Sequence, residues 1–85
     1  MKTFTYVITD PIGIHARPAG QLVKTAQQFQ SRIVVEHKGK KSEATRLMSL
    51  MGMNIRHGDT VQVTVEGADE EAAVERMQTF FQEVL

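Results

Sequence analysis

The sequence predicts an α+β fold, a two-layer arrangement in which helices cover one face of a four-stranded antiparallel sheet. Short stretches alternate apolar and polar residues, as strands do, while longer stretches repeat apolar residues at helical spacing. These stretches follow one another as strand, helix, strand, strand, helix, strand, helix (βαββαβα), an order that separates helices and strands into two layers. The 85 residues, 41% of them hydrophobic, suffice for one modest core, so we expect a single domain over 1–85.

The first half of the chain supplies four of these elements. Phe4, Tyr6 and Ile8 alternate with three threonines and Val7, which predicts a half-buried strand that Asp10-Pro11 ends. Apolar positions from about Ala16 to about Gln28 or Phe29 recur at helical spacing and predict the first helix. Further strands are expected over 33–36 and near 40–43, with the polar segment 37–41 as the hairpin turn between them.

The second half supplies the other three. A short helix is expected from about Leu47 to Met51 or Met53, with Thr45 as its N-cap and Leu50 toward the core. The clearest strand is 60–66, where valines occupy every second position. The last helix should start after Asp69 as its cap, and its core stripe comprises Ala73 or Val74, Met77, Phe80 or Phe81, and Val84.

The stretch Gly13-Ile14-His15-Ala16-Arg17-Pro18-Ala19 concentrates the chemistry. Pro18 suits a first helical turn, where its missing N–H would be unpaired in any case. A helix start directs free N–H groups and a partial positive charge at His15, which favours an anion site. The same field and the nearby Arg17 disfavour imidazolium, so we expect a neutral ring whose lone pair can attack phosphorus.

This stretch, one short strand into an 85-residue chain with this order of elements, resembles HPr, the histidine-containing phosphocarrier family of the bacterial sugar phosphotransferase system. The resemblance covers essentially the whole chain and implies an open-faced sandwich with the last strand between the first and second. It also implies that Nδ1 (the pros nitrogen) of His15 takes a phosphoryl group from enzyme I and passes it to a IIA domain. Arg17 and the backbone N–H groups of Ala16 and Arg17 would stabilise the phosphoryl oxygens.

The resemblance further implies a docking surface on the first two helices around the histidine. Its candidate contacts are Gly20, Lys24, Leu47, Met48 and Met51. Core filling is the other interpretation of the methionines, a solvated side chain that of Lys24. Gly20 fits either close packing or a flat surface for a partner. The family commonly carries a regulatory serine where this chain has Arg46, so phosphorylation by a serine kinase is not expected there.

Several other classes of function are disfavoured. The chain has no cysteine and three scattered histidines, and it lacks a glycine-rich nucleotide motif, so we expect no metal, no cofactor and no independent enzymatic activity. A formal net charge of zero argues against a nucleic-acid binder.

Neither a signal peptide nor a membrane span is evident, which predicts a cytoplasmic protein. A monomer is the simplest expectation, and the alternative function is a regulatory protein-binding module of a specialised phosphotransferase branch.

Overall fold

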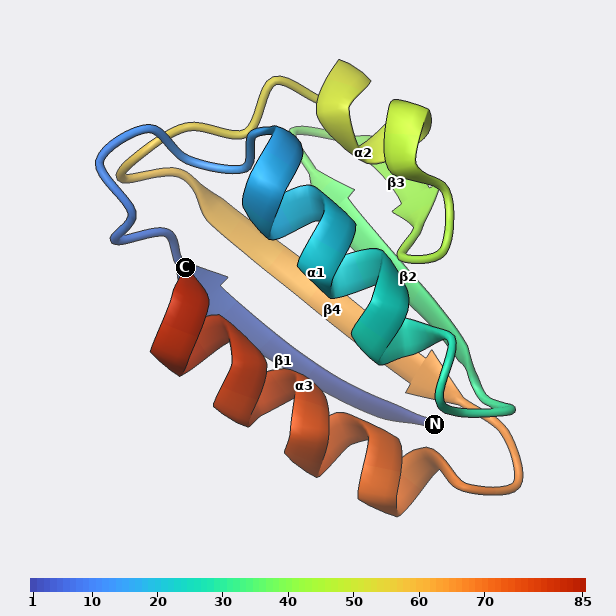
Figure 1. The fold of residues 1–85 in the computed structure, drawn as a ribbon. Helices are drawn as coiled ribbons and strands as arrows, with labels where there is room; N and C mark the ends of the chain where they lie inside the picture. Colours follow the sequence, from blue (N-terminus) through green and yellow to red (C-terminus); the bar gives the residue numbers. More distant parts are fainter.

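The computed structural model describes residues 1–85, and Figure 1 shows three helices on one face of a single sheet. The strands are β1 (Lys2–Val7), β2 (Arg32–His37), β3 (Lys40–Glu43) and β4 (Thr60–Glu66). The helices are α1 (Ala16–Ala26), α2 (Leu47–Gly52) and α3 (Glu70–Val84). No helix is both long and apolar enough to cross a membrane. The element order βαββαβα and the one-sided cover confirm the predicted fold class.

The sheet is antiparallel throughout, in the order β1-β4-β2-β3. β4 therefore lies between the first and second strands, as the family resemblance implied. Its valines at 61, 63 and 65 are all at most 1% exposed, because every second residue of the strand faces the helices. In the core, the ring of Phe81 meets those of Phe4 and Tyr6 edge to face, with centroids 5.7 and 5.6 Å apart.

The hairpin between β2 and β3 is tighter than the sequence suggested. The turn consists of Lys38 and Gly39 alone, whose φ values of 50° and 81° match a two-residue hairpin turn. Of the predicted turn over 37–41, His37 belongs to β2 instead, while Lys40 and Lys41 belong to the short strand that was also expected near 40–43. His37 ends β2 and is only 4% exposed, and Nε2 of its ring lies 2.8 Å from the half-buried carboxylate of Asp59.

Three other boundary expectations need correction. α1 ends at Ala26 rather than near Phe29, since the N–H groups of Gln28 and Phe29 bond three residues back in a tighter turn. The N-cap position of α2 is Arg46, not Thr45, and no side chain caps this helix. Asp69 does occupy the N-cap position of α3, but its carboxylate accepts bonds from Gln30 and Ser31 instead of capping the helix.

Candidate functional site

His15 stands at the N-cap position of α1 with extended backbone (φ −122°, ψ −171°). Its carbonyl accepts the Ala19 N–H at 2.9 Å, while its imidazole makes no capping bond. The N–H groups of Ala16 and Arg17 form no hydrogen bond within the protein, as expected for a helix start. The side chain of His15 is 39% exposed, so its ring is accessible to a partner from solvent.

The loop before His15 is held by Asp10. One carboxylate oxygen of Asp10 accepts the N–H groups of Ile12 and Gly13, at 2.9 and 3.2 Å. That same oxygen lies 4.0 Å from Nε2 of His15. The backbone N–H groups of Thr9 and Asp10 both donate to the main-chain oxygen of Leu85. The loop is thus anchored at both ends before it enters α1.

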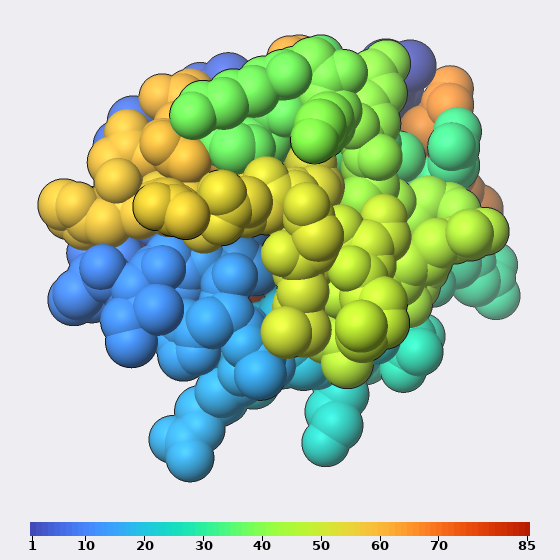
Figure 2. Space-filling model, turned by 90° about the horizontal axis from the view of Figure 1, so that it is seen from above, coloured from blue at the N-terminus to red at the C-terminus, as the bar shows by residue number.

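A second segment, the turn 54–58, packs against this loop. Gly13 has a φ of +87°, and a Cβ there would lie 2.3 Å from the Ile55 oxygen and 2.6 Å from the Cα of Arg56. The Ile14 N–H donates to the same Ile55 oxygen at 3.0 Å. Figure 2 shows the contact from above, with the blue segment of the loop against the yellow segment of the turn. Only glycine allows this approach.

Loop and turn enclose a hollow of about 540 Å³ beside His15. Its polar lining comes from His15 and the turn. Its lining residues are Pro11, Ile12, Ile14, His15, Met51, Asn54, Ile55, Arg56 and His57. Arg17, at the exposed first turn of α1, is not among them. Asn54 and Arg56 were not among the residues that the sequence predicted for the site. No local sequence pattern could have suggested them, because the approach of Gly13 to Ile55 and Arg56 is a contact between segments far apart in the chain.

The expected docking residues lie on the surfaces of α1 and α2. Met48 is 77% exposed, Leu47 39% and Met51 37%, whereas Leu50 of the same helix is fully buried. Lys24 is exposed on α1, and a Cβ on Gly20 would have no neighbour within 4 Å. Close packing is therefore the wrong interpretation of Gly20.

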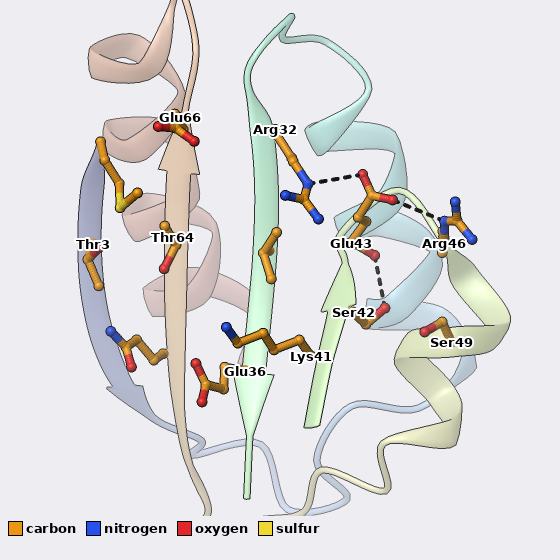
Figure 3. Close-up of a pocket in the computed structure, with 13 residues that line it drawn as sticks. Thr3, Arg32, Glu36, Lys41, Ser42, Glu43, Arg46, Ser49, Thr64 and Glu66 are labelled. Atoms are coloured by element: carbon orange, nitrogen blue, oxygen red, sulfur yellow. Dashed lines mark hydrogen bonds and ion pairs between the residues drawn. The ribbon is translucent and has the colours of Figure 1, made fainter. Parts of the chain in front are cut away.

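Arg46 is also exposed, and its Nε lies 3.2 Å from a carboxylate oxygen of Glu43. The second oxygen of Glu43 faces Nε of Arg32 at 3.6 Å. Figure 3 shows both ion pairs on the face of the sheet that the helices leave uncovered, in a polar hollow of about 670 Å³. Thr3, Thr64 and Glu66 lie in the same hollow, and none of the residues there belongs to the His15 loop. The two hollows are thus separate features of the molecule.

A family model, a curated relative and a solved structure all match this chain over nearly its whole length. The family model PTS-HPr, described as the phosphorylation site of the HPr component, matches residues 2–83. The phosphocarrier protein HPr of Lysinibacillus sphaericus is 39% identical over 84 residues, which cover 99% of this chain and 96% of the relative. The crystal structure of HPr-C-His from Thermoanaerobacter tengcongensis superposes with a TM-score of 0.93 at 37% identity, covering 98% of this chain and 93% of the other.

A second structure from Thermoanaerobacter tengcongensis is of an HPr dimer. It matches with a TM-score of 0.77 at 37% identity and covers 98% of this chain and 95% of that one. Relatives of this fold therefore occur as dimers, and the monomeric state of this chain stays a prediction.

Proposed function

The chain belongs to the HPr family of phosphocarriers of the phosphotransferase system, and on that premise we propose that His15 is its phosphoryl acceptor. The accessible ring of His15 at the start of α1 carries this proposal. The phosphoryl group would come from a phosphohistidine of enzyme I and leave to a histidine of a IIA domain during sugar uptake, in the cytoplasm. The protein then acts as an intermediate in transfer and not as an independent enzyme.

The position of Asp10 supports Nδ1 as the attacking atom. Asp10 carries a carboxylate oxygen 4.0 Å from Nε2 of His15, and a carboxylate favours the proton on the nitrogen that faces it. Nδ1 then keeps its lone pair. As the donor's P–N bond breaks, its electron pair returns to the donor nitrogen, while the Nδ1 lone pair forms the new P–N bond. Each ring keeps the proton on its other nitrogen, so no proton has to move, and Asp10 faces the positive ring that results.

The donors at the start of α1 suit a temporary cargo. The free N–H groups of Ala16 and Arg17, together with the exposed guanidinium of Arg17, can stabilise the charge that spreads over the phosphoryl oxygens in the transition state. Because the side chains there are solvent-accessible, the group is held without being sealed in. The exposed residues Leu47, Met48 and Met51 on α2, with Gly20 and Lys24 on α1, would form the surface on which enzyme I and IIA domains dock.

Incubation with phosphoenolpyruvate and enzyme I tests the proposal. We expect one acid-labile phosphate per chain, detected by intact mass, and its complete loss in His15→Ala. His57→Ala is the matched control, because His57 is exposed and lines the same hollow, and it should be phosphorylated like the wild type. A phosphate retained by His15→Ala would contradict the assignment. If enzyme I leaves the wild type unmodified while the chain binds a regulatory protein, the alternative role as a binding module gains support.

A further inference from the structure

We propose that Arg56 is a second guanidinium that contacts the phosphoryl group at His15, from the side opposite α1. The inference rests on the proposed carrier function and deepens it. Arg56 lines the hollow that His15 also lines, whereas Arg17 does not. The hollow therefore has a cation of its own, contributed by a segment about 40 residues farther along the chain.

The backbone of Arg56 is fixed relative to His15. Its Cα lies where a Cβ on Gly13 would be only 2.6 Å away, and the neighbouring Ile55 oxygen accepts the Ile14 N–H at 3.0 Å. Gly13 and Ile14 directly precede His15. The turn that carries Arg56 and the loop that carries His15 therefore behave as one packed unit, so the spacing between the two side chains is set by backbone contacts.

The side chain of Arg56 is also held by a hydrogen bond. Its Nε donates to Oδ1 of Asn54 at 3.2 Å, and Asn54 itself adopts a left-handed backbone with φ of 57°. The main-chain N–H of Arg56 donates to a carboxylate oxygen of Asp59 at 3.0 Å. These bonds use Nε and the backbone and leave the two terminal nitrogens of the guanidinium free. No carboxylate forms an ion pair with Arg56, so its charge is available to an anion.

Two guanidinium groups from different segments of the chain suit the proposed transfer. The phosphoryl group has three equatorial oxygens that share the charge in the transition state, so it can accept from more than one guanidinium. Arg56 would hold a remaining oxygen through its terminal N–H groups, in the planar geometry that guanidinium offers and ammonium does not. The bonds made and broken are those of the proposed transfer, and Arg56 adds only electrostatic stabilisation.

Single-turnover transfer from phosphorylated enzyme I, measured at several chain concentrations, tests Arg56→Gln. We expect the maximal rate to fall about 10-fold, as for the loss of one hydrogen bond to a charged group, with half-saturation changing less than about 2-fold because docking residues are intact. Arg56→Lys should recover only part of the rate. Arg32→Gln is the matched control: it also removes one exposed guanidinium, on the uncovered face of the sheet, and it should transfer at the wild-type rate. Unfolding midpoints in urea should be the same for all four proteins.

The outcomes separate this inference from the proposed function. If the wild type accepts phosphate and Arg56→Gln accepts it equally fast, the inference is overturned and the carrier function stands. A rise in half-saturation alone would also overturn it, because Arg56 would then be a docking charge. If the wild type accepts no phosphate, the carrier function fails and the inference fails with it. As a second readout, the Arg56 Nε–H resonance should shift on phosphorylation of His15, and an unmoved resonance would count against the contact.

Discussion

Nε2 of His37 lies 2.8 Å from Oδ2 of Asp59, and this contact joins the hairpin β2–β3 to the turn beside His15. A carboxylate only accepts, so Nε2 is the donor. The second ring nitrogen of His37, Nδ1, is buried and has no partner. The same oxygen of Asp59 accepts the Arg56 N–H at 3.0 Å, and the Asp59 carbonyl accepts the Ile8 N–H at 2.9 Å. One aspartate thus connects three segments.

His37→Phe should destabilise the protein. The variant keeps an aromatic ring in the buried position but removes the side-chain donor of the Asp59 carboxylate, which then keeps only the Arg56 N–H. We expect a lower midpoint of urea unfolding, followed by circular dichroism. His57→Phe is the control, because His57 is exposed and makes no hydrogen bond, and its midpoint should not change. Equal midpoints for His37→Phe and the wild type would show that the contact contributes nothing to stability.

Acid should destabilise the fold through Asp69 and Asp59. The hydroxyl of Ser31 and the N–H of Gln30 hold the pKa of Asp69 below its ordinary value of 3.8, and the Arg56 N–H and the His37 ring lower the pKa of Asp59 likewise. Between native and ordinary pKa values the unfolded chain binds more protons than the native chain. This stabilisation is therefore complete above the ordinary pKa and is lost as the pH falls through the native one.

Urea midpoints measured from about pH 6 down to about pH 2.5 check this dependence. Asp69→Asn cannot lose a proton, so its curve should be flatter than that of the wild type. Glu75→Gln, at an exposed position without a hydrogen bond, should keep the wild-type slope. The explanation through Asp69 is wrong if its variant shows the same pH dependence as the wild type.

Gly13→Ala should both destabilise the fold and slow phosphorylation. The new Cβ would meet the Ile55 oxygen at 2.3 Å, in a backbone conformation with φ of +87°. A non-glycine residue held in such a region costs about 1–3 kcal/mol, and here the turn 54–58 must also shift away. Chemical denaturation and the rate of transfer from enzyme I measure the two effects. Gly52→Ala, where a Cβ has no neighbour within 4 Å, should be as stable as the wild type and as fast.

Met48→Ser should weaken docking without changing stability. Met48 is 77% exposed on α2, so removing its apolar surface leaves the core intact. We expect the half-saturation concentration for enzyme I to rise about 10-fold, as for a central contact of a protein interface, while the maximal rate stays the same. Val7→Ser is the control, because Val7 is 52% exposed but lies on β1, away from α2. An unchanged half-saturation for Met48→Ser would remove α2 from the proposed docking surface.

Local patterns were enough to predict the fold class and the position of His15 at the start of a helix. The alternating valines of β4 and the helical spacing in α1 and α3 are properties of neighbouring residues, and the structure places them as expected. The sheet order could not come from such patterns and was obtained only through the family resemblance. The same was true of the roles given to Arg17 and the residues of α2.

What the sequence could not predict are contacts between polar residues far apart in the chain. His37 looked like a turn residue because its type is polar, yet its partner Asp59 lies 22 residues away. Asp69 looked like a helix cap, and its carboxylate instead bonds Ser31, 38 residues away. Arg56 lies at the candidate site because its backbone packs closely against Gly13. Each depends on which turns meet in space, and no local pattern contains that information.

The main-chain oxygen of Leu85 accepts N–H groups from Thr9 and Asp10 as well as the Thr9 hydroxyl, and β1 pairs only with β4. Both contacts join residues translated early to residues translated late. Long-range pairings of this kind form only when their second partner is available. A nascent chain that has not yet reached residue 85 therefore lacks contacts that hold the loop before His15. Such a chain should be a poor acceptor in the proposed phosphorylation of His15.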